Sequence, residues 1–169
     1  GKVDLDFFIQ QSIDDAPSNS DMDTEVKIFQ NALDFSSIKI RDCIVPRTEV
    51  VAVDLTTSLE ELKSLFVESG ISKIIVYDGN IDNVVGYIHS SEMFRNPADW
   101  RNNVKEVPIV PETMAAHKLM KLFMQQKKTI AVVVDEFGGT SGIVSLEDLV
   151  EEIFGDIEDE HDNTSVSYT

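Results

Sequence analysis

Two stretches of this chain carry the same series of residues in an almost constant register. Equivalent residues lie 57 positions apart in the first part of each copy and 56 apart in the second: Leu62 with Leu119, Phe66 with Phe123, Val76 with Val133, Asp78 with Asp135, Gly86 with Gly142, Ile88 with Val144 and Glu92 with Asp148. Such a register indicates a tandem duplication. The chain is therefore constrained to build one small unit twice.

Each copy predicts the order strand, helix, strand, strand, helix. The expected elements of the first copy cover residues 50–53, 58–70, 73–77, 84–88 and a stretch from Ser90 onward. Ser58 stands three positions before Glu61, which is the spacing of a capping box, and Gly70 marks the end of the helix. The Asp-Gly-Asn sequence at 78–80 predicts the turn between the two strands.

The second copy ends in the most strongly patterned stretch of the chain, residues 129–155. An apolar run over 130–134 predicts a strand, a glycine pair turns the chain, a short strand follows at 143–144, and Ser145 opens an acidic helix. One face of that helix is apolar and consists of Leu146, Leu149, Val150, Ile153 and Phe154. Gly155 stands where the helix is expected to stop.

Composition changes along the chain predict the boundaries of its parts. Polar, acidic stretches flank a patterned middle, and Pro46 limits regular structure ahead of the first copy. The expected organisation is a flexible acidic arm over 1–24, a lead-in helix and linker over 25–49, the first repeat over 50–96, the second repeat over 97–155 and an acidic exit tail over 156–169.

Charge and cysteine content exclude several classes of function. The formal net charge of -17 at pH 7 repels nucleic acid, and no basic stripe with interleaved aromatic residues is present. Cys43 is the only cysteine, so an internal disulfide or a CxxC site is impossible. No apolar run approaches the roughly 18 residues of a membrane span. We expect a soluble chain in a reducing cytoplasm, and the absence of a nucleophile and base set argues against an enzyme.

Three motifs resemble one known family. RDCIVPR at 41–47, YDGNIDNVVG at 77–86, and DEFGGT at 135–140 followed by LED at 146–148 are similar to the corresponding stretches of the CorC/HlyC family of magnesium and cobalt efflux proteins. In that family they belong to a CBS domain pair, or Bateman module. The resemblance covers about residues 25–162 and implies an α/β (α+β) fold of tandem CBS repeats, each β-α-β-β-α, with two small sheets packed together and helices outside.

The resemblance also implies a cellular setting. Family members carry an N-terminal transmembrane domain and often a C-terminal CorC/HlyC domain, so this chain is expected to be a piece of a larger protein at the cytoplasmic face of a membrane. Two CBS pairs commonly form a disc-shaped homodimer. Clefts between repeats hold AMP or ATP, in some members with Mg²⁺, and occupancy is thought to gate ion export.

The nucleotide signature of such pairs falls in the second repeat. It consists here of Gly142, Ile143, Ser145 and Asp148. Glycine permits close backbone approach, Ser145 caps a helix whose free amides suit phosphate, and the carboxylate of Asp148 can accept ribose hydroxyls. The adenine ring is expected near Val107 and Ile109, with Lys127, Lys128 or Thr129 near the phosphates.

The first repeat departs from this signature. His89 replaces the hydroxyl residue and Glu92 replaces the aspartate. A weaker first site would comprise Thr48, Lys73, His89 and Glu92.

Each of these features also has a purely structural interpretation. Ser145 and Asp148 fit a helix capping box, and Asp135 fits a turn better than a phosphate-accepting aspartate. The acidic series over 147–162 could hold Mg²⁺ but is more typical of a solvated helix face, and the three histidines lack zinc-ligand spacing. An alternative function is a ligand-free structural dimerisation platform of the same transporter family.

Overall fold

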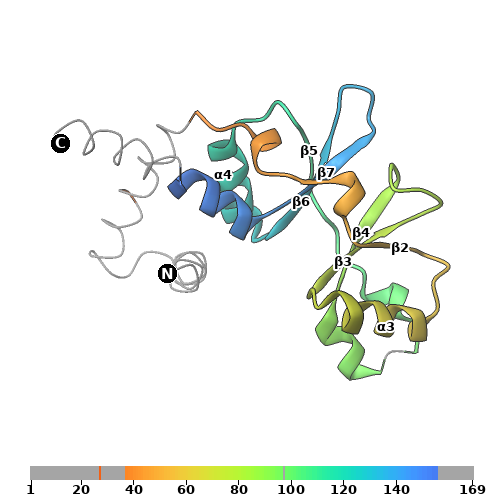
Figure 1. Ribbon diagram of the computed structural model, residues 1–169. Helices are drawn as coiled ribbons and strands as arrows, with labels where there is room; N and C mark the ends of the chain where they lie inside the picture. The colour runs from red at the N-terminus through yellow and green to blue at the C-terminus, as the bar shows by residue number, and fades with distance from the viewer. Residues whose placement is uncertain (1–26, 28–36, 97, 156–169) are drawn as a thin grey trace. The chain divides into compact units, whose positions relative to one another are not determined.

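The computed structural model describes residue 27, residues 37–96 and residues 98–155 (Figure 1). The chain divides into two compact units. We call the first the helical unit; its described part comprises residue 27 and residues 37–44, 112–130 and 144–155. The second, the sheet unit, comprises residues 45–111 and 131–143. The predicted acidic arm, most of the predicted lead-in helix and the exit tail lie outside the described residues.

A three-stranded sheet forms the first repeat's part of the sheet unit. Its order is β2 (Ala52–Asp54), β3 (Lys73–Tyr77) and β4 (Val84–His89), with β2 parallel and β4 antiparallel to β3. The strand predicted at 50–53 is displaced toward Asp54, and the other two strands are confirmed almost to the residue.

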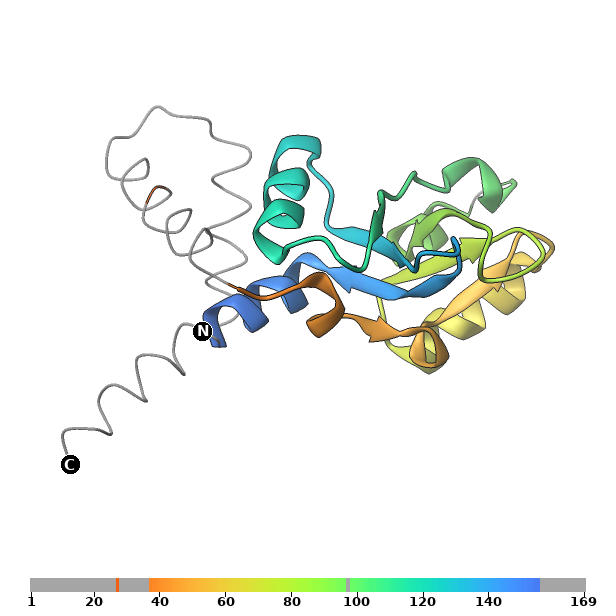
Figure 2. The ribbon, with the colours of Figure 1, turned by 90° about the horizontal axis from the view of Figure 1, so that it is seen from above.

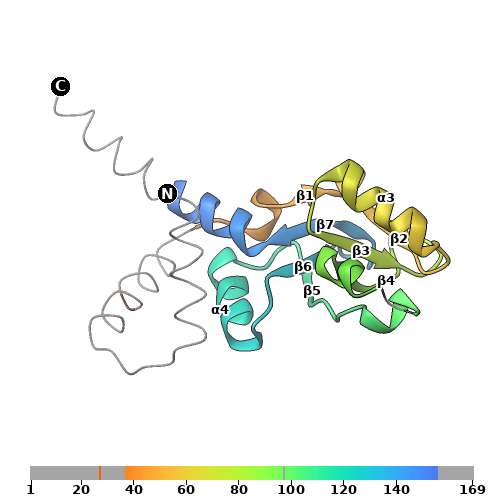
Figure 3. The same cartoon turned by 90° about the horizontal axis from the view of Figure 1, so that it is seen from below.

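Helix α3 (Leu59–Ser69) lies along one face of this sheet (Figure 3). The predicted capping box is present: Ser58 Oγ accepts the Glu61 N–H at 3.2 Å, and the Glu61 carboxylate accepts the Ser58 N–H at 3.4 Å. Gly70 ends the helix in the left-handed region, at φ 70°. The core between helix and sheet consists of Val53, Leu62, Phe66, Ile74, Val76, Ile88 and Trp100.

The second helix predicted for the first repeat is wrong in type. Residues Ser90–Arg95 form a 3-10 helix, η3, that ends when Asn96 takes a left-handed conformation at φ 48°. Pro97 follows, and a residue before proline is disfavoured in the α region, so the helix cannot continue. A further 3-10 helix, η4 (Trp100–Asn103), returns Trp100 to the core, where its indole N–H donates to the carbonyl of Thr57 at 2.9 Å.

A four-stranded sheet has the order β1 (Val45–Pro46), β7 (Thr140–Ser145), β6 (Ile130–Val134) and β5 (Ile109–Pro111) (Figure 2). Strand β5 is parallel to β6, and β1 is antiparallel to β7. The sequence did not predict β1. A proline is tolerated there because β1 is an edge strand of two residues. The predicted hairpin of β6 and β7 is confirmed, although β7 is longer than expected.

The helical unit contains α4 (Ala116–Gln126) and a helical stretch over residues 146–155. Backbone hydrogen bonds tie α4 to the segment before the sheets, from Ala116 N–H to Ile38 and from Ile40 N–H to Met114, both at 2.9 Å. The fully buried side chains of the helical unit include Ile40, Leu119, Met120, Phe123, Leu149 and Ile153.

Gly155 is helical and is the last described residue of this stretch, so the helix stop predicted there stays a prediction. It does not take the positive φ that ends α3 at Gly70. Within the described ranges, none of the helices combines the length and the apolar character of a membrane span.

Candidate functional site

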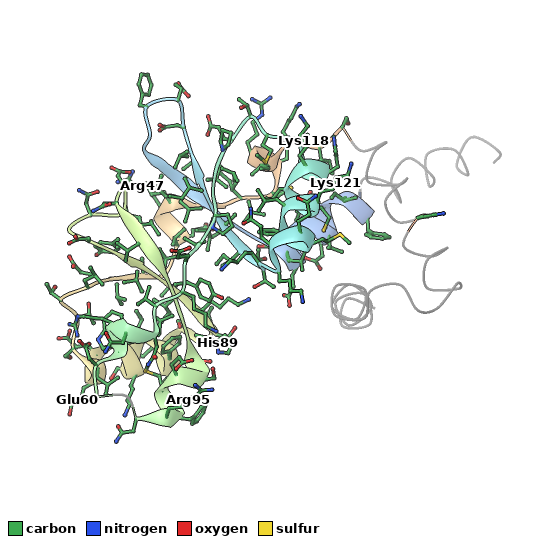
Figure 4. All side chains as sticks on the ribbon, turned by 180° about the vertical axis from the view of Figure 1, so that it is seen from behind. Arg47, Glu60, His89, Arg95, Lys118 and Lys121 are labelled. Atoms are coloured by element: carbon green, nitrogen blue, oxygen red, sulfur yellow. The ribbon has the colours of Figure 1, made fainter. Side chains whose placement is uncertain are left out.

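Three sequence motifs meet in the sheet unit at the carboxylate of Asp82. The Arg47 guanidinium donates to it from Nη1 at 2.5 Å and from Nη2 at 3.4 Å, and the Thr140 N–H donates to Oδ1 at 2.9 Å. The buried Thr140 hydroxyl donates to the carbonyl of Ile81 at 2.8 Å. Arg47 lies beside the two hairpins (Figure 4). Hydrogen bonds within the chain thus connect the three motifs to one another.

The loop of the second hairpin is organised by Asp135. Its Oδ1 accepts the N–H groups of Phe137 and Gly139, each at 2.9 Å. The prediction that Asp135 is a turn residue is therefore confirmed. The loop holds Phe137 outward, with 88% of its surface exposed.

The two equivalent glycines of the repeats serve the same purpose. A Cβ on Gly142 would collide with the carbonyl oxygen of Val45, and a Cβ on Gly86 would collide with that of Lys105. Pro46 of β1 pairs with Gly142 and Lys105 forms an isolated bridge with Tyr87, so backbone of the chain itself occupies the space at each glycine. The close approach expected at Gly142 is made, at least on this side, by protein backbone.

Ser145 and Asp148 lie in the helical unit at the start of the helix over 146–155. Ser145 Oγ accepts the Asp148 N–H at 3.1 Å, which is the first arm of a capping box. The return arm, from the Ser145 N–H to the Asp148 carboxylate, does not occur among the contacts of the described residues. In α3, by contrast, Glu61 makes both arms. The half-buried carboxylate of Asp148 is thus not consumed by capping.

Thr129 is brought next to this helix start. Its carbonyl accepts the Leu146 N–H at 2.8 Å, so Thr129, Ser145 and Asp148 gather in one part of the helical unit. Lys128 follows α4 directly and is half-buried, and its N–H donates to Phe123 at 3.0 Å.

The remaining residues predicted for this site belong to the sheet unit. Ile109 opens β5 opposite Val132 and is 59% exposed. Val107 precedes that strand and is half-buried, and Ile143 pairs with Val45 across β7 and β1.

Three of the four residues predicted for the weaker first site also gather. Lys73 and His89 are direct partners across β3 and β4, and Glu92 follows in η3 with only 7% of its surface exposed. His89 Nδ1 accepts the Ser91 N–H at 3.0 Å. Thr48 is an exposed residue of η2 (Arg47–Glu49), and no hydrogen bond joins it to the other three among the described contacts.

Burial and neighbouring charges shift the pKa of two groups, His89 and Cys43. Burial lowers the pKa of His89, and the neighbouring cations of Lys73 and Lys105 lower it further. Sequence analysis missed Lys105, whose position depends on a backbone bridge to Tyr87 that no local pattern signals. Burial, followed by the charges of Glu152, Asp42 and Asp148, raises the pKa of the Cys43 thiol to about 12.

Acidic and imidazole groups are abundant but not arranged as a metal centre. Over residues 37–96 and 98–155, no three side chains of His, Cys, Asp or Glu are grouped so as to hold a metal ion. His161 and the acidic residues after 155 lie outside that range.

Comparison with known proteins identifies the class. A model of the CBS domain family matches residues 40–99 and 103–155, so the chain belongs to the CBS domain family and carries the domain twice. The expected mixed α/β fold with two small sheets is thereby confirmed.

Individual relatives confirm the resemblance seen in the motifs. The hemolysin C homologue of Rickettsia rickettsii is 40% identical over 144 residues, which are 82% of this chain and 48% of the relative. The possible hemolysin C of Rickettsia canadensis is 44% identical over the same shares. The chain thus spans about half the length of these curated relatives.

Solved structures agree. The CBS domain of a bacterial CNNM/CorC family Mg²⁺ transporter in complex with ATP is 33% identical, with a TM-score of 0.68 over 78% of this chain and 98% of the other. A CBS domain pair from Klebsiella pneumoniae with bound AMP is 25% identical, with a TM-score of 0.63 over 70% of this chain and 99% of the other.

Proposed function

We propose that this chain is the cytoplasmic regulatory module of a CorC-type divalent cation efflux protein and binds an adenine nucleotide at the motif of residues 142–148. The role is binding and switching, not catalysis. The similarity to transporter CBS domains supports the setting, and the relatives solved with ATP and AMP support the ligand class. The parent protein's membrane domain and C-terminal CorC/HlyC domain are the proposed partners.

The observation that carries the proposal is the single-armed cap at Ser145. Ser145 Oγ occupies one amide of the helix start, and the Asp148 carboxylate is left to accept other donors. Vicinal ribose hydroxyls are such donors. The positive end of the helix dipole at the start of a helix attracts phosphate. In this proposal, the Asp148 carboxylate accepts hydrogen bonds from the ribose. The start of the helix and Lys128 bind the phosphates, and Mg²⁺ accompanies ATP.

Calorimetric titration of the purified chain with ATP and AMP, each with and without Mg²⁺, tests the proposal. We expect saturable binding of one nucleotide per chain. Asp148→Ala should abolish it at little cost in stability, because the cap donor is the backbone amide of residue 148 and survives the substitution.

Glu61→Ala is the matched control. It removes the carboxylate at the same position of α3, where the carboxylate already closes a capping box. Glu61→Ala should lower stability by about 0.3–1.5 kcal/mol and leave nucleotide binding unchanged. Full binding by Asp148→Ala would refute the ribose role, and no binding by the wild-type chain at millimolar nucleotide would refute the sensor.

Exposed apolar side chains favour a second candidate, a homodimerisation platform without a ligand. Val67 on α3 is 83% exposed and Phe94 on η3 is 91% exposed, both in the sheet unit. Large exposed apolar side chains are typical of interaction surfaces when they cluster. Sedimentation of the wild type and of Val67→Ser with Phe94→Ser tests this role: a dimer that the double substitution dissociates supports it, and a monomeric wild type contradicts it.

A further inference from the structure

The loop of the first hairpin carries the one Asp-Gly sequence of the chain. Asp78 follows β3 directly, Gly79 comes next, and no asparagine of the sequence precedes a glycine. An aspartate before a glycine is prone to close a succinimide ring, in which the backbone nitrogen of the next residue binds the side-chain carboxyl carbon. Glycine favours this reaction because it has no side chain to hinder the approach. Both residues are exposed to water.

The surroundings of Gly79 leave the reacting groups accessible. Gly79 takes φ 87°, and a Cβ built on it would meet nothing within 4 Å. Among the contacts of residues 37–96 and 98–155, no acceptor binds the Gly79 N–H and no donor binds the Asp78 carboxylate. Neither the attacking nitrogen nor the carboxyl group therefore has to break a hydrogen bond within this part of the chain before it reacts.

Asn83 binds the peptide group that must react. Its side-chain N–H donates to the Asp78 carbonyl at 3.1 Å, and its own carbonyl accepts the Asp78 N–H at 2.9 Å. A donor on a carbonyl oxygen polarises the amide, so the N–H on the other side of that amide becomes more acidic. That N–H belongs to Gly79. The contact with Asn83 thus favours loss of the Gly79 proton, which attack by its nitrogen requires.

The equivalent aspartate of the second repeat lies in a different environment. Asp135, displaced by 57 from Asp78, is followed by Glu136 and not by a glycine. Its Oδ1 accepts the N–H groups of Phe137 and Gly139, each at 2.9 Å. The carboxyl group of Asp135 is therefore already bound within its loop. The two hairpins share an aspartate at the same position, and only the first leaves its carboxyl group unbound among the described contacts.

Asp78 also begins the loop that supplies Asp82 to the network of hydrogen bonds described above. Asp82 accepts from the Arg47 guanidinium and from the Thr140 N–H (Figure 4). Isoaspartate at position 78 would route the main chain through the side-chain carbon. It would lengthen the loop and turn the carbonyl that Asn83 binds into a separate carboxylate. The loop could then no longer present Asp82 in the same place.

We propose that Asp78 is a modification site at which the folded chain converts spontaneously to isoaspartate, and that the product releases Asp82 from Arg47 and Thr140. The first hairpin then has a limited chemical lifetime that the second hairpin does not share. This site does not depend on nucleotide binding at residues 142–148.

The reaction needs only water and the groups of the loop. The Gly79 nitrogen attacks the carboxyl carbon of Asp78, a C–N bond forms, and the carboxyl hydroxyl leaves with the amide proton as water. Water then adds to the ring carbonyl that was the backbone carbonyl of Asp78 and breaks its bond to nitrogen. The product has the mass of the original chain, its peptide bond to Gly79 runs from the side-chain carbon, and no group is oxidised or reduced.

Peptide mapping of the full chain after several weeks at physiological temperature tests the first half of the proposal. The probe is protein isoaspartate methyltransferase with labelled S-adenosylmethionine, which marks isoaspartate. We expect at least about tenfold more label at Asp78 than at Asp135, because only Asp78 precedes a residue without a side chain. A free peptide of residues 75–83 is aged beside the chain. Label in that peptide but none at Asp78 of the folded chain would overturn the proposal.

Three variants identify the cause of the reactivity. Asp78→Glu keeps the charge but would need a larger, less favoured ring, so the label should disappear. Asp78→Asn should react faster, since an amide loses ammonia more readily at neutral pH than a carboxylate loses water; its unfolding is therefore measured on fresh protein. Glu136→Gly places a second Asp-Gly sequence at 135–136, and Asp135 should still react more slowly than Asp78 because its carboxylate is bound. Equal label at the two sites would refute the role of the unbound carboxyl group.

Urea unfolding followed by Trp100 fluorescence tests the second half. The aged chain should contain a population with a lower urea midpoint, in the same proportion as isoaspartate at position 78. Repair with the methyltransferase and unlabelled S-adenosylmethionine should restore the original midpoint. Ageing should shift the midpoint of Asp82→Asn less, because that variant already lacks the charged contact with Arg47. Isoaspartate at position 78 with an unchanged midpoint would show that Asp82 is not released.

Discussion

A single carboxylate, that of Asp82, joins the motifs that make this chain recognisable. The Thr140 N–H and then the Arg47 side chain hold the pKa of Asp82 below its ordinary value. A group whose pKa is lower in the folded state stabilises the fold above its unfolded-state pKa. That contribution is lost as pH falls through the folded-state value.

Asp82→Asn should therefore destabilise the chain at neutral pH, and the difference from wild type should shrink below about pH 4, where the unfolded-state carboxyl protonates. Urea unfolding at neutral and acidic pH, followed by Trp100 fluorescence, measures both differences. Asp78→Asn, in the same loop, serves as the control because no hydrogen bond joins the Asp78 carboxylate to Asp82, Arg47 or Thr140 among the described contacts. A difference that stays constant with pH would show that charge at Asp82 is not involved.

Lys127 has a strained backbone conformation that the first repeat avoids with a glycine. It ends α4 in the left-handed region at φ 54°, whereas α3 ends with Gly70 at φ 70° in the equivalent position. A side chain with a Cβ is disfavoured there. Lys127→Gly should raise the free energy of unfolding by about 0.5–1 kcal/mol, measured by urea denaturation. Gly70→Ala should lower the free energy of unfolding by a similar amount. A loss of stability in Lys127→Gly would show that the backbone of Lys127 is not strained.

At the scale of elements, the residue pattern predicted the structures that form between residues close together in the sequence. The β3–β4 and β6–β7 hairpins and the cap of α3 follow from local alternation and the spacing of Ser58 and Glu61. The type of η3 was predicted wrongly because Asn96, which is left-handed and precedes Pro97, ends the helix after six residues. Strand β1 was missed because its partner, β7, lies almost a hundred residues away and no local pattern records such pairing.

The residues of the candidate sites likewise divide into those that the sequence predicted and those that it did not. The motif of Ser145 and Asp148 was visible in sequence, and so was the substitution of His89 and Glu92 at the equivalent positions of the first repeat. Lys105 was not visible, because its place beside Tyr87 arises from a backbone bridge.

The two bridged glycines give a prediction at this scale. Gly142→Ala and Gly86→Ala would each drive a methyl group into a backbone carbonyl, and a strand cannot move aside as a flexible side chain does. Each should cost at least about 1–3 kcal/mol of stability by thermal or urea unfolding. Gly155→Ala is the control: it is helical, its Cβ would meet open space, and it should stabilise by about 0.5–1 kcal/mol. Near-neutral substitution at Gly142 would show that β1 does not hold its position.

At the scale of the whole molecule, the chain passes repeatedly between its two compact units. Crossings fall after residues 44, 111, 130 and 143, so each unit is assembled from separate segments. Neither unit can lose its structure without loosening segments that continue into the other. This connectivity favours unfolding in one cooperative step.

The chain carries one natural probe in each unit. Trp100, the only tryptophan, is buried in the sheet unit, and Cys43, the only cysteine, is buried in the helical unit with its pKa raised to about 12. Thiol labelling of Cys43 and fluorescence of Trp100 should therefore report the same urea midpoint, with a native thiol that resists labelling. Separate midpoints would show that the two units unfold independently.

The backbone segments at the two glycines also connect the two CBS regions of the chain. The first CBS region supplies Val45 and Pro46 to the sheet of the second, and the second region supplies Lys105 to the sheet of the first. A single repeat made alone would carry a bare glycine groove and a spare strand that fits the same groove in another molecule. Two such molecules would satisfy each other by reciprocal strand exchange. The tandem arrangement lets one chain make both exchanges within itself.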